Sequence, residues 1–232
     1  MNPKIILITG TRKGIGRSLA DYYLDQNHIV FGCSRGPSDL QHKNYRHYCL
    51  NVTDEDLVKK LFNDIKKEFG ALDILINNAG IASMNHSLFT EIKTIKNIFD
   101  TNLIGTFLFS REAAKLMKNR NFGRIINFST VAVRLKLEGE AIYAASKAAV
   151  NTLTEVLAVE FADFGITVNA IGPTPVKTDL IKNIPQDKMS KLINRLPLKR
   201  LGEFDDILNV VDFLIKPESN FITGQIMYLG GA

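Results

Sequence analysis

The chain has 232 residues, of which 45% are apolar and 23% charged, and its formal net charge is +5. These values are ordinary for a globular protein that buries a substantial core as one domain. The lysines and arginines are scattered among acidic residues, so the charge gives no positive case for binding nucleic acid. No apolar stretch approaches the roughly 18 residues of a membrane span. Cys33 and Cys49 have neither disulfide-framework nor metal-site spacing, and we expect a cytoplasmic protein with reduced thiols.

Short apolar runs alternate along the chain with segments of helical periodicity. The runs predict strands at residues 5–9, 29–33, 45–51, 72–77, 124–129, 166–171 and 225–229. The periodic segments predict helices at residues 16–26, 53–69, 92–117 with a break near Asn102, 141–164 and 205–215. This alternation indicates a parallel sheet covered by helices on both faces. Residues 174–200 contain three prolines and interrupt the alternation, so we predict a substrate lid there.

The motif T-G-T-R-K-G-I-G follows the first predicted strand and opens the first predicted helix. Glycines in such a turn let the backbone approach a pyrophosphate closely, and the helix N-terminus offers N–H groups and a positive dipole. A purely structural turn is the alternative interpretation. The predicted phosphate-binding residues are Gly10, Thr11, Arg12, Lys13, Gly14, Ile15 and Gly16.

With this glycine spacing the sequence resembles the short-chain dehydrogenase/reductase family. The resemblance continues through N-N-A-G (77–80), N-L (102–103), Y-x-x-x-K (143–147), V-N-A-I-G-P (168–173) and I-T-G-Q (222–225), in the family's order. It implies an α/β Rossmann fold over residues 1–232, with a single domain and a doubly wound parallel sheet of about seven strands. It also implies an oxidoreductase that forms a homodimer or homotetramer. One departure is Pro173-Thr174, which stands where the family has P-G and leaves the local turn open.

The end of the second predicted strand, F-G-C-S-R, favours NADP(H) over NAD. An NAD-preferring protein places an acidic residue there for the ribose 2′-hydroxyl, whereas here the first acidic residue is Asp39. Arg35 would pair with a 2′-phosphate, and Ser34 and Lys13 can approach the same group. A solvated Arg35 is the alternative. The resemblance adds Asn51 and Val52 near the adenine, Asn78, Ala79 and Gly80 along the ribose, and Pro173, Val176 and Thr178 toward the nicotinamide.

Tyr143 and Lys147 lie four residues apart on a predicted helix and therefore share a face. Carbonyl reduction needs an acid that protonates the oxygen as hydride arrives at the carbon. Free tyrosine titrates near pH ~10, and a nearby ammonium eases its proton transfer. The resemblance implies that Lys147 also holds the nicotinamide ribose, and that Asn102 carries a proton-relay water.

Two adjacent hydroxyls, Ser129 and Thr130, precede this pair. The family's serine, which hydrogen-bonds the substrate carbonyl, commonly lies thirteen residues before the tyrosine, and that count reaches Thr130. Adjacent residues leaving a strand point to opposite sides, so we expect only one to serve. A threonine keeps the hydroxyl at the cost of a methyl group and a stiffer χ1. A one-residue change in the loop would instead give the role to Ser129.

The substrate is left open between two kinds of small-molecule carbonyl compound. The pattern is closest to 3-oxoacyl-thioester reductases, partly because of G-I-T-V-N and of L-x-R-L-G-E at residues 198–203. Carrier-protein-dependent relatives tend to have a basic residue before G-I-T-V-N, where this chain has Phe164, so a carrier-protein partner is less favoured. A sugar-derived or other polar ketone is the rival. A noncatalytic NADP-binding regulator is a third interpretation, although such proteins usually lose the tyrosine or the lysine.

Overall fold

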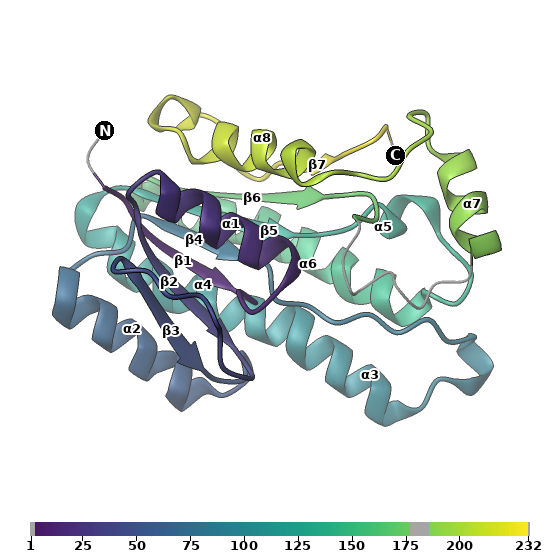
Figure 1. Cartoon of the computed structure of the whole chain (residues 1–232), viewed down its shortest axis with the longest axis horizontal. Coiled ribbons are helices and arrows are strands. Elements are labelled where there is room, and N and C mark those ends of the chain that lie inside the picture. The colour runs from purple at the N-terminus through teal and green to yellow at the C-terminus, as the bar shows by residue number, and fades with distance from the viewer. Residues whose placement is uncertain (1–2, 177–185, 232) are drawn as a thin grey trace.

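A computed structural model, which describes residues 3–176 and 186–231, contains one seven-stranded sheet with the order β3-β2-β1-β4-β5-β6-β7 (Figure 1). All neighbouring strands are parallel. The strands are β1 (Ile5–Thr9), β2 (Ile29–Ser34), β3 (Tyr45–Cys49), β4 (Ile74–Asn77), β5 (Gly123–Phe128), β6 (Ile166–Gly172) and β7 (Ile226–Tyr228). The α-helices are α1 (Gly14–Asp25), α2 (Glu55–Phe69), α3 (Ile92–Phe99), α4 (Gly105–Met117), α5 (Ala132–Leu135), α6 (Ala141–Glu160), α7 (Gln186–Arg195) and α8 (Phe204–Ile215). The predicted doubly wound parallel sheet is therefore confirmed.

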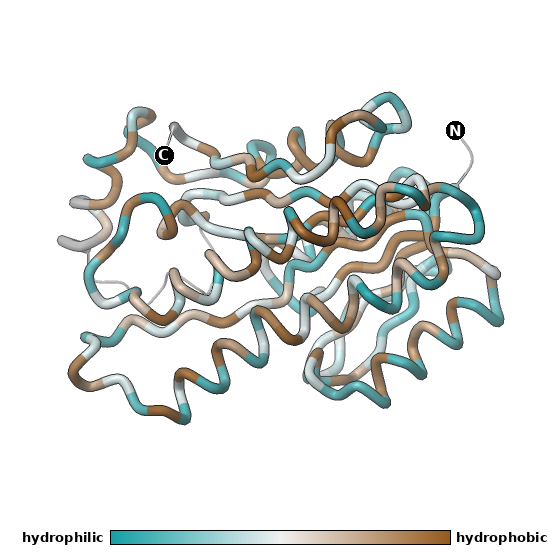
Figure 2. The backbone as a smooth tube through the Cα atoms, turned by 180° about the vertical axis from the view of Figure 1, so that it is seen from behind, coloured by the Kyte–Doolittle hydropathy of each residue, from teal (hydrophilic) through white to brown (hydrophobic). Residues whose placement is uncertain are grey.

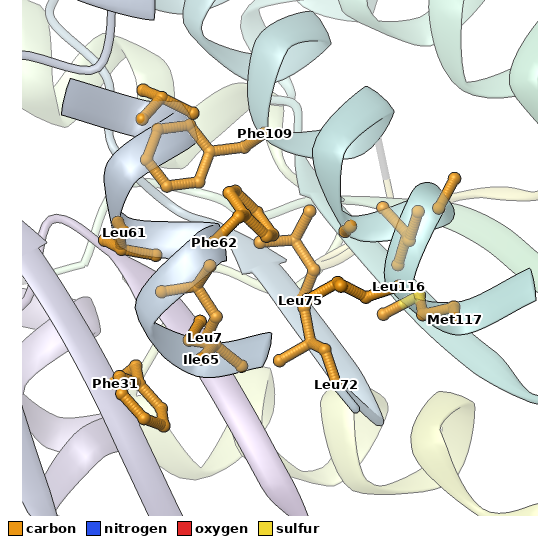
Figure 3. Packing of buried hydrophobic residues seen from close by; sticks show 14 of the residues in the cluster. Leu7, Phe31, Leu61, Phe62, Ile65, Leu72, Leu75, Phe109, Leu116 and Met117 are labelled. Carbon is orange, nitrogen blue, oxygen red and sulfur yellow. The ribbon is translucent and has the colours of Figure 1, made fainter. Parts of the chain in front are cut away.

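Successive side chains of the central strands enter two separate cores. In β1, Leu7 joins the core beneath α2, α4 and α6, whereas Ile6 and Ile8 join the core beneath α1 and α8. Figure 3 shows the first core, where Phe62 of α2 meets Phe109 of α4 with ring centroids 5.7 Å apart. Figure 2 shows hydrophobic residues concentrated along the central strands. Along the outer helices, hydrophobic and hydrophilic residues alternate. Burial on both faces explains why these strands read as continuous apolar runs.

Several predicted boundaries shift where capping and local geometry decide them. The helix predicted from residue 53 begins at Glu55, because the Asp54 side chain accepts a hydrogen bond from the Leu57 N–H at 3.0 Å and caps it. The predicted helix 92–117 is divided by a π-helical segment, Asp100–Ile104, which contains the expected break at Asn102. The predicted helix 141–164 ends at Glu160 and continues as a 3₁₀ turn.

The predicted lid contains a helix that the prolines did not indicate. Helix α7 lies within it, and Arg195 donates a 2.6 Å hydrogen bond to the carbonyl of Leu135 in the short helix α5, which the sequence also did not predict. Residues 177–185, including the predicted cofactor contact Thr178, lie outside the described residues. A substrate lid at residues 174–200 remains a prediction.

The sheet order changes direction between β1 and β4, since β2 and β3 lie to one side and β4 to β7 to the other. In open parallel sheets ligands bind outside the carboxyl ends of the strands at such a switch point. The fold therefore directs attention to the loops that follow β1, β2, β4 and β5.

Candidate functional site

A cavity of about 450 Å³ lies at the carboxyl ends of these strands. It brings together residues from five motifs that are far apart in the sequence, and also Asn51 and Val52. The predicted site residues that line it are Gly10, Arg12, Lys13, Gly14, Ile15, Ser34, Arg35, Asn51, Val52, Asn78, Ala79, Gly80, Tyr143, Lys147 and Pro173. The predicted residues Thr11, Gly16, Asn102, Thr130 and Val176 lie around it and are not part of its lining.

The glycine-rich turn needs its glycines for backbone conformation and for space. Gly10 and Gly14 have φ of 80° and 63°, in the left-handed region. A Cβ on Gly16 would lie 2.4 Å from both the Gly10 carbonyl oxygen and Nδ2 of Asn78. No side chain fits there, so α1 packs closely on the turn with its N-terminus toward the cavity.

The N-N-A-G motif both lines the cavity and supports the sheet. Asn78 Nδ2 donates to the Thr9 carbonyl at 2.8 Å, and the Ala79 N–H donates to Thr9 Oγ1 at 2.9 Å, so the motif is fixed to the glycine-rich turn. Asn77 is buried in the core, where its Nδ2 donates to Asn127 Oδ1 at 2.9 Å. Asn77 therefore holds β4 to β5 beneath the site.

The end of the cavity that lies at the glycine-rich turn and the loop after β2 is positively charged. Arg12, Lys13 and Arg35 line it together with Ser34. Arg12 also reaches the loop after β2, because a Cβ on Gly36 would lie 2.9 Å from Arg12 Nη1. Cations beside a closely packed glycine turn suit an anionic dinucleotide, and the absence of an acidic side chain from this described lining suits one that carries a 2′-phosphate.

Thr11 has a different position from its neighbours. Its side chain is fully buried and hydrogen-bonds the Tyr45 hydroxyl at 2.8 Å, while its N–H donates to the Cys33 carbonyl at 3.2 Å. The structure therefore places Thr11 behind the turn as a support.

Tyr143 and Lys147 occupy successive turns of α6 and line the same cavity. Lys147 is 4% exposed, and its Nζ donates a 2.7 Å hydrogen bond to the Phe128 carbonyl at the end of β5. A Cβ on Gly80 would lie 3.3 Å from both Lys147 Nζ and Asn102 Oδ1, so these two side chains face the same small space. The predicted lysine and asparagine thus lie close together.

The Asn102 side chain fixes the loop after β4. Its Oδ1 accepts from the Ile81 N–H at 2.9 Å, and its Nδ2 donates to the Ile81 carbonyl at 2.9 Å and to Ser146 Oγ at 3.0 Å. These contacts bind the π-helical segment both to the cavity wall and to α6.

Burial shifts the proton affinities of both central side chains. It raises the pKa of Tyr143 to about 12, an effect opposed by the nearby Thr130 hydroxyl and increased by the carboxylate of Glu140. Burial lowers the pKa of Lys147 to about 8. Tyr143 therefore carries its proton at neutral pH, whereas Lys147 loses its proton at a pH closer to neutrality than an exposed lysine does.

The two hydroxyls before α6 differ as the strand geometry predicts. The Thr130 hydroxyl accepts the Ala132 N–H at 3.3 Å and lies near enough to Tyr143 to favour a lower pKa of that phenol. Ser129 is 3% exposed, and within residues 3–176 and 186–231 its hydroxyl has no hydrogen-bond partner. Thr130 thus lies toward Tyr143, whereas Ser129 contributes to the cavity wall.

The unusual Pro173-Thr174 turn is accommodated by two glycines. Thr174 is buried, and a Cβ on Gly202 would lie 2.7 Å from its Oγ1, as would a Cβ on Gly230 from its Cγ2. The Pro173 carbonyl accepts the Val131 N–H at 3.2 Å, and Val176 forms a parallel bridge with Gly202. Gly202 and Gly230, from the C-terminal part of the chain, therefore provide the space for the Thr174 side chain, which stands where the family has a glycine.

Some lining residues were not predicted from the sequence. Asn97 and Thr101 reach the cavity from the end of α3 and the π-helical segment. Their four-residue spacing within the predicted helix 92–117 was the available signal, since it puts two polar side chains on one helix face. Tyr45 and His47 on β3, which lie behind the β2 loop, had no such signal.

Comparison with known proteins agrees with this geometry. The family model described as "Enoyl-(Acyl carrier protein) reductase" matches residues 10–231. The chain is 34% identical over 234 residues to the 3-oxoacyl-[acyl-carrier-protein] reductase FabG of Escherichia coli, covering 98% of this chain and 96% of that protein. FabG of Vibrio harveyi is 33% identical with the same coverage.

Solved structures are similar over the same length. The structure titled "ElxO with NADP Bound" has a TM-score of 0.89 and 34% identity, covering 98% of this chain and 97% of that one. Ligand-free Thermoplasma acidophilum aldohexose dehydrogenase has a TM-score of 0.89 and 30% identity, covering 99% and 93%. The chain belongs to the short-chain dehydrogenase/reductase family, and it is an oxidoreductase of that family. None of its helices, within the part of the chain that the structure describes, is long and apolar enough to cross a membrane.

Proposed function

We propose that this protein is an NADPH-dependent reductase that converts a ketone to a secondary alcohol. The observation that carries the proposal is that Tyr143 and the buried Lys147 line one end of a cavity whose other end is lined by cations, with the Thr130 hydroxyl near enough to affect the pKa of Tyr143. Bound NADPH would supply the hydride. The chain's own residues then need to orient the carbonyl and deliver one proton to its oxygen.

The proton comes from Tyr143. Its phenol is protonated at neutral pH and can donate to a carbonyl oxygen held within hydrogen-bond distance. Thr130 donates a second hydrogen bond to that oxygen and so stabilises the negative charge that develops there. The ammonium of Lys147 lowers the cost of forming tyrosinate and can return the proton through the space that it shares with Asn102.

The proposed preference for NADPH over NADH follows from the cation-lined end of the cavity. Arg35, Arg12 and Lys13 present positive charge, and the NADP in the ElxO structure shows that a similar protein binds this cofactor. We place the 2′-phosphate beside Arg35 and Ser34, the pyrophosphate at the glycine-rich turn, and the adenine between Asn51 and Val52. Gly80 and Lys147 then flank the nicotinamide ribose.

The substrate proposal rests on the curated relatives, which are named as 3-oxoacyl-[acyl-carrier-protein] reductases. We propose a 3-oxoacyl thioester as the substrate. Phe164 is 40% exposed where a basic docking residue would serve a carrier protein, so a smaller thioester is favoured over a carrier-bound one. The aldohexose dehydrogenase supports a sugar-derived or other polar carbonyl as the second candidate.

Initial rates of NADPH oxidation at 340 nm test the proposal. The panel contains a 3-oxoacyl thioester, the corresponding enoyl thioester, a sugar-derived ketone and a buffer blank, and Tyr143→Phe is the control. We expect the 3-oxoacyl thioester to be reduced and the variant to be inactive while it still binds NADPH. Turnover of the polar ketone alone would select the second candidate, and turnover of neither ketone would reject the proposed reaction.

A further inference from the structure

A chain of hydrogen bonds runs behind the loop that we assign to the 2′-phosphate. It starts at Thr11 in the glycine-rich turn, whose Oγ1 lies 2.8 Å from the Tyr45 hydroxyl. The Tyr45 hydroxyl lies 2.9 Å from Nδ1 of His47, and Nε2 of His47 lies 3.1 Å from both the Gly36 carbonyl oxygen and Ser34 Oγ. Two cofactor-facing segments, one from β1 and one from β2, are thus connected through two side chains of β3.

The chemistry of the endpoints fixes the direction of these bonds. A carbonyl oxygen only accepts, so His47 must carry its proton on Nε2 to bond Gly36. In the neutral imidazole Nδ1 then accepts from the Tyr45 hydroxyl, and that hydroxyl accepts from Thr11. Every donor in the chain points toward the β2 loop.

The Gly36 carbonyl accepts a second bond, from the Ser34 hydroxyl at 2.7 Å. A 2′-phosphate offers only acceptor oxygens, so Ser34 can bind it only by turning its proton away from Gly36. A partly buried carbonyl that loses its donor costs free energy. Because His47 keeps its bond to Gly36, Ser34 can turn to the phosphate without leaving that carbonyl unpaired.

Strand β2 is shaped to admit this chain. A Cβ on Gly32 would lie 2.3 Å from the Tyr45 hydroxyl oxygen and 2.4 Å from Thr11 Oγ1. Tyr45 is 8% exposed, so its hydroxyl is held inside the protein at this position. The glycine in F-G-C-S-R therefore gives the tyrosine hydroxyl its place between the turn and the loop.

We propose that His47, supported by Tyr45, is a positioning residue for 2′-phosphate recognition, which it serves by holding the Gly36 carbonyl and so releasing the Ser34 hydroxyl. The inference rests on the proposed NADPH dependence and adds a residue outside the cavity lining to it. The role concerns the 2′-phosphate alone, so NADH binding does not depend on it.

Fluorescence titration of NADPH and NADH, together with adenosine 2′,5′-bisphosphate against 5′-AMP, tests the proposal on purified variants. His47→Leu removes the donor to Gly36, and His47→Gln keeps an N–H donor of similar reach. Tyr45→Phe removes one oxygen from the chain. Tyr48→Phe is the matched control on the same strand, because its hydroxyl donates instead to Asp64 at 3.3 Å.

We expect His47→Leu to lower the NADPH-to-NADH affinity ratio by about tenfold or more, the scale of one hydrogen bond to a charged group. The bisphosphate-to-AMP ratio should fall in parallel. His47→Gln should recover most of the loss, Tyr45→Phe should show a smaller one, and Tyr48→Phe should match the wild type. Thermal unfolding of each unliganded variant separates misfolding from loss of recognition.

A His47→Leu protein that keeps the wild-type ratio, or that loses NADPH and NADH affinity equally, overturns the inference while the cofactor proposal stands. If the wild type itself binds both cofactors equally, the proposed NADPH preference is rejected and this inference is rejected with it.

Discussion

At the scale of single residues, the most informative position is Thr130, because its hydroxyl affects the pKa of Tyr143, whereas the buried hydroxyl of Ser129 has no hydrogen-bond partner among the described residues. Thr130→Val removes the hydroxyl at nearly constant shape. We expect turnover to fall by roughly 10²-fold or more, the order found when one donor to a developing oxyanion is lost. Steady-state rates with saturating NADPH measure the effect.

The matched controls are Thr130→Ser, which keeps the donor and should remain active, and Ser129→Ala, which should be mild. An inactive Ser129→Ala protein beside an active Thr130→Val protein would assign the substrate contact to the serine instead. That result would contradict the proposed role of Thr130 as the donor to the substrate carbonyl.

Arg35 gives a prediction about cofactor choice. Arg35→Asp replaces a cation by an anion at the proposed 2′-phosphate site, so NADPH should lose affinity and NADH should become the preferred cofactor. The loss of a charge-assisted contact corresponds to about 1.5–3 kcal/mol for NADPH. Dissociation constants of both cofactors provide the measurement, with Arg46→Asp, which alters the Arg46–Glu68 ion pair on β3, as a charge-matched control. An unchanged preference would mean that Arg35 is a solvated loop residue.

Lys147 gives a prediction about pH. Burial lowers its pKa to about 8, whereas Tyr143, with a pKa of about 12, keeps its proton throughout the usual assay range. As the pH rises through 8, Lys147 loses the charge that favours tyrosinate, so kcat/KM for ketone reduction should decline above that pH. Initial rates between pH 6 and pH 10 would reveal the alkaline limb. A rate that stays constant to pH 10 would contradict the assigned role of the ammonium.

The sequence predicted much of the site because its residues belong to short motifs. Within a helix or at the end of a strand, the spacing of such residues determines where they lie in the structure. The helical repeat placed Tyr143 and Lys147 on one face, whereas the choice of Thr130 over Ser129 also needed the spacing found in the family that the sequence resembles. His47 could not be found in this way, because its partners belong to the loops after β1 and β2. Its position follows from the pairing of β2 with β3, which no local pattern encodes.

At the scale of elements, helix α2 owes its start to one side chain. Asp54 caps it through the Leu57 N–H, and the acidic Glu55 and Asp56 favour the same end of the helix dipole. Asp54→Ala should lower the free energy of unfolding by about 1 kcal/mol, or about 2–4 °C in Tm. Thermal unfolding followed by circular dichroism tests this, and Asp54→Asn, which keeps an acceptor, should stay near the wild type. Equal losses in both variants would point to charge and not to capping.

Elements with strong periodicity were predicted well, and those that depend on distant contacts were not. Helix α2 and the central strands have clear apolar patterns. Helix α5 has only four residues, too few for a periodic signal, and α7 lies in a proline-containing segment and is anchored to α5 by Arg195. Such elements depend on tertiary packing, which overrides local propensity.

At the scale of the whole molecule, the outer faces of α4 and α6 present apolar side chains that the protein's own core does not use. Val156 and Val159 of α6 are 48% and 78% exposed, and Ile104 and Phe107, at and near the start of α4, are also exposed. The neighbouring Leu157, by contrast, is 3% exposed and packs in the core beneath α4 and α6. The unused surface therefore lies on the Val156 and Val159 face.

We predict that this face is covered by a second copy of the chain, in a homodimer or homotetramer. Stable association generally buries about 1,200–2,000 Å² in total, with an apolar centre, and the exposed valines suit such a centre. Light scattering at micromolar concentration should give at least twice the monomer mass of 25.9 kDa.

Val156→Glu with Val159→Glu should shift the mass toward the monomer, because burying two carboxylates at the contact is costly. Leu198→Glu, at an exposed apolar residue away from these helices, is the control and should leave the mass unchanged. A monomeric wild type would contradict the prediction and leave the apolar face to another partner.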